Sequence, residues 1–214
     1  MQIYWHGYSS VRIESKNGEK TCVLVTDPFE NESAIRFPRT VDPDVIVLGH
    51  QDRSRYALDG IGSAPFIISD PGEYEVKGVF INGIQDEKAE GGKERPLIHR
   101  IYTEGMSVAF IGSLRRKPTD AELERLENVD ILLISVGGGE AYDHEMASDV
   151  ISIIEPRVVV PLNFAIPGIK AKLGSVDQFC KQLGVCTREN MTKLKLQKKD
   201  LPPEDMLVAV LERA

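Results

Sequence analysis

The residue types that could do chemistry in this chain gather between His50 and Arg55. His50 and Asp52 could ligate a divalent cation, and carboxylates from Asp86 or Glu87 would complete an oxygen-rich set that suits manganese or magnesium better than zinc. Arg55 argues against that chemistry, because a permanently cationic guanidinium repels a dication and offers Asp52 a bidentate partner. A lone histidine is also more often a hydrogen-bonded structural residue than a ligand. We therefore expect no bound metal. If the chain does bind a metal, the weak candidate ligands are His50, Asp52, Asp86 and Glu87.

Two further segments could be functional, but neither carries a complete motif. Ser9, Ser10 and Ser54 could be nucleophiles, yet no G-x-S-x-G elbow occurs and Ser54 lacks an assignable base and orienting acid. Three glycines at 137–139 precede an expected helix and could cradle a phosphate. They lack the P-loop lysine and the G-x-G-x-x-G spacing, so a tight strand-to-helix turn is the better interpretation.

Composition and charge exclude several classes of function. The 214 residues are 42% hydrophobic and 28% charged, and no linker or charge block divides them, so we expect one domain over residues 1–214. The 26 basic and 33 acidic residues give a net charge of -7, which works against general nucleic-acid binding. No apolar run approaches the length that spans a bilayer, and we expect no membrane association.

The cysteines bear on the compartment. Cys22, Cys180 and Cys186 are odd in number and lack CxxC spacing, which suggests a reducing environment. The N-terminus enters a strand-like pattern without a basic region. We expect a cytoplasmic location.

The elements that must position these residues change character along the chain. Residues 2–5, 10–14, 21–26, 45–48, 66–69, 74–81, 98–103 and 107–111 read as strands, with Asn17-Gly18 as a hairpin signal and 85–96 as an exposed loop. Helices then alternate with apolar strands at 131–136 and 158–162. Thr119 with Glu122 and Ser175 with Gln178 form capping boxes, Asp143 is an N-cap for residues 144–154, and two strands end the chain at 193–197 and 206–211.

Two successive halves, about 1–105 and 106–214, each contain several strands with helices attached. This pattern predicts an α+β fold in which two sheets pack face to face with helices outside, a four-layer αββα sandwich.

Ordered segments of the chain resemble the metallo-β-lactamase superfamily, particularly its small lactonase-like branch of Zn-dependent hydrolases. The matching segments are residues 5–13, 25–29, 42–50, 70–76, 129–139 and 155–161. The resemblance implies the metallo-β-lactamase fold, and it implies a homo-oligomer. It also implies that Asp27 is an acceptor that braces the His50 loop, and that His6 is not a ligand.

In that family a His-x-His-x-Asp-His loop and further ligands hold one or two zinc ions that activate a water. Here only His50 matches the pattern, since Asp52, Ser54 and Arg55 stand at the other three positions. The later ligand positions correspond to Glu87 or its neighbours Gln85 and Asp86, to Ser113 and to Asn163. The resemblance thus points to a degenerate site made of His50, Asp52, Ser54, Arg55, Glu87, Ser113 and Asn163.

Three functions remain open. The first is a metal-free, non-catalytic pseudoenzyme that binds an unknown protein partner or acts in assembly, with no catalytic residue assigned. The second is a divergent hydrolase of ester, lactone or phosphodiester bonds that uses one or two Zn or Mn ions around His50. The third is a binder of a small anion, in which Arg53 and Arg55 replace the metal charge and Asp52 pairs with Arg55.

Overall fold

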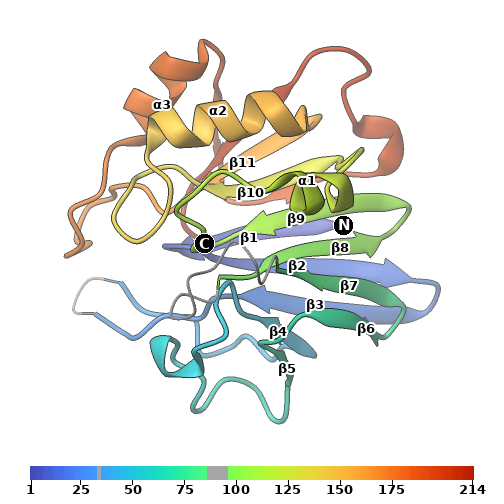
Figure 1. Cartoon of the computed structure of the whole chain (residues 1–214). Helices are drawn as coiled ribbons and strands as arrows, with labels where there is room; N and C mark the ends of the chain where they lie inside the picture. Colours follow the sequence, from blue (N-terminus) through green and yellow to red (C-terminus); the bar gives the residue numbers. More distant parts are fainter. Residues whose placement is uncertain (33–34, 86–95) are drawn as a thin grey trace.

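The computed structural model describes residues 1–32, 35–85 and 96–214, with the backbone alone at residues 187–190. Its strands form two sheets that pack face to face (Figure 1). The main hydrophobic core draws buried side chains from both sheets, including Trp5 and Ile13 of the first and Phe110 and Leu133 of the second. Burial of one apolar face of each sheet is what holds the two layers together.

The first sheet has the order β13-β1-β2-β3-β4-β5 among the described residues. Its strands β1, β2 and β3 form antiparallel pairs, and β3, β4 and β5 run parallel. A tight turn joins β2 to β3, and Gly18 there has the positive φ of 62° that hairpin turns require. The bounds are β1 Gln2–Gly7, β2 Ser10–Asn17, β3 Lys20–Thr26, β4 Val45–Val47, β5 Phe66–Ile68 and β13 Leu194–Lys195.

The second sheet has the order β12-β14-β11-β10-β9-β8-β7-β6. Strands β9, β10, β11 and β14 run parallel, and the first three are buried along their whole length, as sheets covered on both faces must be. The bounds are β6 Gly72–Val76, β7 Val79–Ile84, β8 Ile98–Thr103, β9 Met106–Ile111, β10 Ile131–Ser135, β11 Val158–Leu162, β12 Thr187–Met191 and β14 Leu207–Leu211.

Three α-helices, α1 (Asp120–Arg125), α2 (His144–Ile154) and α3 (Val176–Leu183), cover the outer face of the second sheet (Figure 1). Both expected capping boxes are present, at Thr119 and Ser175, and Asp143 caps α2 by accepting a hydrogen bond from the Met146 amide. A second apolar cluster lies on the first sheet and contains Val25, Phe37, Val41, Ile46, Leu48 and Ile61. Phe37, Val41 and Ile61 of the connecting loops cover the sheet there, and the short 3-10 helix η1 (Arg53–Arg55) has no buried residue. The predicted α+β sandwich is confirmed.

Two details of the prediction were wrong. Residues 74–81 are not one strand, because Lys77 and Gly78 both have positive φ, 51° and 79°, and turn the chain into the β6–β7 hairpin. Such a pair of left-handed residues defines the two-residue turn that suits twisted strands. The sheets also divide between β5 and β6 rather than near residue 105, and β13 returns to the first sheet beside β1.

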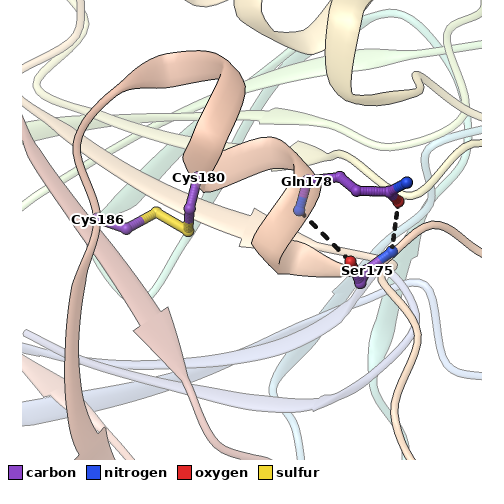
Figure 2. The surroundings of a disulfide bond; sticks show 4 residues. All are labelled: Ser175, Gln178, Cys180 and Cys186. Carbon is purple, nitrogen blue, oxygen red and sulfur yellow. Dashed lines mark hydrogen bonds between the residues drawn. A yellow bond between two sulfur atoms is a disulfide. The ribbon is translucent and has the colours of Figure 1, made fainter.

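The cysteines differ from the expectation as well. Cys180 of α3 and Cys186 just after it form a disulfide (Figure 2). Cys22 is free and buried. Spacing of six residues around the helix-ending Gly184 brings the two sulfurs together. Because disulfides are rare in reducing compartments, the cysteines no longer support the cytoplasmic location, which stays a prediction.

Among the described residues, no helix combines the length and the apolar character that crossing a bilayer demands.

Candidate functional site

The carboxyl ends of the parallel strands in both sheets meet at one edge of the sandwich. Asp27 follows β3, His50 follows β4 after two residues, Ser113 follows β9, Gly137 follows β10, and Asn163 follows β11. Open α/β sheets bind ligands at this kind of edge, because loops there converge while the strands hold them rigidly.

A cleft of about 560 Å³ opens at this edge. Its apolar lining includes Pro28, Phe29, Ala141 and Leu173. Its polar lining consists of Tyr8, Ser9, Asp27, Arg55, Tyr56, Ser113, Glu140, Asn163 and Lys172. Arg55, Ser113 and Asn163 of the predicted degenerate site therefore do share one cavity, whereas His50, Asp52 and Ser54 do not line it.

Asp27 is the buried acid of the cleft. Its Oδ1 accepts a hydrogen bond from the Gly49 amide at 2.6 Å, so the expected brace on the His50 loop is present. Burial raises its pKa to about 7, against the opposing effects of the Gly49 amide, the Tyr56 hydroxyl and the Arg55 charge. The backbone of Asp27 is left-handed, with φ of 35°, which is an uncommon conformation for a residue other than glycine. A carboxyl group in this state exchanges its proton near neutral pH.

Tyr56 links Asp27 to the opposite wall. Its hydroxyl forms hydrogen bonds with the side chains of Asp27 and Ser113, and burial raises its pKa far above the usual value. Ser113 Oγ in turn donates to the Gly49 carbonyl at 2.7 Å. No sequence motif points to Tyr56, whose only signal is its place directly after Arg55.

His50 and Asp52 form local hydrogen bonds that hold the loop after β4. It is buried, its Nδ1 accepts a hydrogen bond from the Asp52 amide at 3.0 Å, and its backbone forms a bridge to Pro96. Asp52 is the N-cap of η1, since its Oδ1 accepts from the Ser54 amide at 3.0 Å and from the Ser54 hydroxyl at 2.7 Å. These two hydrogen bonds lower the pKa of Asp52. The Ser54 amide and hydroxyl are therefore both donors to the carboxylate that caps η1.

The expected ion pair between Asp52 and Arg55 is not formed. Arg55 Nη2 instead pairs with Glu140 Oε2, a residue of the loop after β10 that the sequence analysis did not single out. Arg115 reaches the same residue, with Nη2 at 3.8 Å from Glu140 Oε1 and Nε donating to the Glu140 carbonyl at 3.3 Å. Arg53 Nε donates to Ser69 Oγ at 2.8 Å, and Arg53 is not among the residues that line the cleft.

The glycine run at 137–139 is a tight turn packed on the loop after β11. A Cβ at Gly137 would lie 2.2 Å from the Asn163 carbonyl oxygen, and the Gly174 amide donates to the Gly137 carbonyl at 2.7 Å. Asn163, with φ of 53°, donates from Nδ2 to the Gly138 carbonyl at 3.4 Å. Close backbone packing explains these glycines.

The remaining histidines lie outside the cleft lining. His6 and His99 are buried, and burial lowers the pKa of each to about 4. His99 Nε2 lies 2.7 Å from the Leu48 carbonyl oxygen, and its ring stacks on Phe110. His144 begins α2, as expected.

Among the described residues, the side chains at the family's ligand positions other than His50 differ from those that bind zinc. Across residues 1–32, 35–85 and 96–214, no three His, Cys, Asp or Glu side chains converge in a way that could hold a metal ion. Arg55 supplies a cation, and the Ser113 hydroxyl and the Asn163 amide donate hydrogen bonds to backbone carbonyls. Asp86 and Glu87 lie outside the described residues.

The chain is similar in sequence to known proteins of one family. A sequence model of the β-lactamase superfamily domain matches residues 2–163. A UPF0173 protein of Pyrococcus abyssi is 26% identical over 208 residues, which cover 86% of this chain and 90% of the relative. A second, from Pyrococcus furiosus, is 25% identical over 189 residues, which cover 77% and 83%.

Solved structures agree. A proposed Zn-dependent hydrolase of the metallo-β-lactamase superfamily from Thermotoga maritima superposes with a TM-score of 0.79 at 27% identity, covering 99% of this chain and 100% of that one. Igni18, a metallo hydrolase from Ignicoccus hospitalis, shares the fold with a TM-score of 0.60 at 16% identity, covering 86% and 90%. From its sequence match and its fold together, the chain belongs to the metallo-β-lactamase superfamily.

Proposed function

We propose that this chain is a metal-free, non-catalytic member of the superfamily that binds a ligand in the cleft at the strand ends. The observation that carries the proposal is Arg55, which stands at the family's last histidine position and lines the cleft as one half of an ion pair with Glu140. A protein cation thus supplies positive charge where the family places a metal.

The other replaced positions support the same reading. Asp52 is used as a helix cap, and Ser113 and Asn163 tie loops together. Ser113 and Asn163 offer a neutral hydroxyl and a neutral amide, which are weaker zinc ligands than carboxylate or imidazole.

The metal content of the purified protein tests this proposal. Protein prepared without chelator should contain far less than one equivalent of zinc, manganese or iron by plasma mass spectrometry, and titration with Zn²⁺ or Mn²⁺ should not raise its melting temperature. The positive control restores the family pattern at five positions, with Asp52→His, Ser54→Asp, Arg55→His, Ser113→Asp and Asn163→His. Stoichiometric metal in the unaltered protein would overturn the proposal.

A second candidate function is a divergent metal-dependent hydrolase. It is favoured by the Thermotoga maritima protein, a proposed Zn-dependent hydrolase that aligns over nearly all of this chain. The metal, Zn or Mn, would bind around His50 and Asp52 with help from Asp86 or Glu87. This candidate requires metal-dependent cleavage of an ester, lactone or phosphodiester that His50→Ala abolishes, whereas the leading proposal expects no turnover with or without metal.

The assembly of the protein is a further part of the proposal. The superfamily resemblance suggests that the chain forms a homo-oligomer. Alternatively, the chain binds a different protein as its partner. Light scattering after size exclusion gives the mass in solution directly, and a monomer at all concentrations would remove the oligomer from the proposal.

A further inference from the structure

Glu140 occupies an unusual position at the mouth of the cleft. Its carboxylate contacts two guanidinium groups from different elements, Arg55 of η1 and Arg115 of the segment after β9. Yet the Glu140 side chain is 72% exposed, while that of Arg55 is only 33% exposed. The carboxylate is therefore held at the surface over a cation that belongs to the cleft wall.

The Glu140 side chain can leave without any rearrangement of the fold. Exposed ion pairs contribute little to stability, because water and salt solvate the separated charges almost as well. The loop itself is anchored independently, since the Arg115 Nε bond goes to the Glu140 backbone carbonyl and the Gly138 amide donates to Tyr142. Rotation of one exposed side chain then uncovers the Arg55 guanidinium.

The charges that would face a ligand are those of the cleft lining. Arg55 and Lys172 are cationic, and Glu140 is the exposed carboxylate. Asp27 is a buried carboxyl group that is hydrogen-bonded to Tyr56. With Glu140 turned away, the mouth of the cleft is positive. The space below it is lined by Pro28, Phe29, Ala141 and Leu173.

We propose that the cleft binds a small carboxylic acid with an apolar body, and that Glu140 is an internal competitor that holds the carboxylate position when the ligand is absent. Arg55 takes the ligand carboxylate in the place of the Glu140 carboxylate, since its planar fork suits a second carboxylate equally well. The apolar body fills the space beside Phe29 and Leu173. This inference rests on the proposed function for its site, and it adds the ligand class and the competing residue.

Calorimetric titration with benzoate and hexanoate tests the inference, with benzamide as the uncharged probe and phenyl phosphate as the alternative anion. Glu140→Gln should bind the carboxylates about two- to fivefold more tightly, the range expected from loss of an exposed ion-pair competitor. Arg55→Gln should weaken binding of the carboxylates and leave benzamide unchanged. Glu204→Gln, an exposed change outside the cleft lining, is the matched control.

Three results would overturn the inference: no carboxylate binding to either the unaltered protein or Glu140→Gln, equal binding to Arg55→Gln, or preference for phenyl phosphate over benzoate. None of these bears on the metal content, so the proposed metal-free state is judged separately by its own assay. Conversely, stoichiometric metal together with carboxylate binding that Arg55→Gln weakens would retain the ligand and reject the metal-free function.

Discussion

At the scale of single residues, the ion pair in the site differs from the one that the sequence predicts. Arg55 was expected to bind Asp52, but Asp52 is already used by the amide and hydroxyl of Ser54, two residues along the chain. Aspartate is a preferred N-cap residue, so its carboxylate is readily used by nearby backbone amides. The long arginine side chain can instead reach a carboxylate of another loop. Sequence adjacency therefore misdirected the pairing, and Glu140 became the partner.

Asp27 gives a prediction of pH dependence. Its folded pKa of about 7 lies above the ordinary value of 3.8, so between these two values the folded protein binds more protons than the unfolded chain. The stability that Asp27 contributes is thus fully present below about pH 4 and is lost as the pH rises through 7. The slope is at most about 1.4 kcal/mol per pH unit for one proton.

The measurement compares urea unfolding of the protein and of Asp27→Asn from pH 4 to 8. Asparagine retains an acceptor for the Gly49 amide and does not titrate, so the variant should gain stability relative to the parent as the pH rises from 4 to 7. His6 and His99, with pKa values of about 4, destabilise both proteins equally at the acidic end. A constant difference across the whole range would show that folding does not raise the pKa of Asp27.

At the scale of elements, the sequence patterns predicted the helices well, but they did not predict which sheet each strand joins. Capping boxes at Thr119 and Ser175 are local signals and were confirmed, as Figure 2 shows for Ser175 and Gln178. Sheet membership depends on distant pairings, such as β13 with β1, that local patterns do not encode. The same reason explains the site: the cleft positions of Ser113 and Asn163 came from a family pattern, while Glu140 and Tyr56 matched none.

The disulfide at the end of α3 gives a prediction for this element. Cys180→Ser with Cys186→Ser should lower the free energy of unfolding by about 2 kcal/mol, because the bond closes a short loop and restricts the unfolded chain. Urea unfolding with and without dithiothreitol measures the effect. The reduced parent should match the double variant, and the variant should not respond to the reductant; a parent equally stable in both conditions would mean that the bond does not form in solution.

At the scale of the whole molecule, contacts between distant parts of the chain suggest one cooperative unit. Trp5 of the first sheet packs on Phe164, which follows β11 of the second, with ring centroids 4.4 Å apart. As the single tryptophan, Trp5 reports on this junction by fluorescence. We predict that its urea midpoint coincides with that of far-UV circular dichroism. Two separated midpoints would instead mean that the surroundings of Trp5 unfold separately from the rest of the structure.

The late return of the chain to its first strand has a consequence for synthesis. While β13 and β14 are still to be made, β1 and β11 each expose a row of unpaired backbone groups beside a nearly complete sheet. Open edges of that kind invite pairing with other nascent chains. The edge of β1 therefore stays open from the start of synthesis until residues 194–195 have been made.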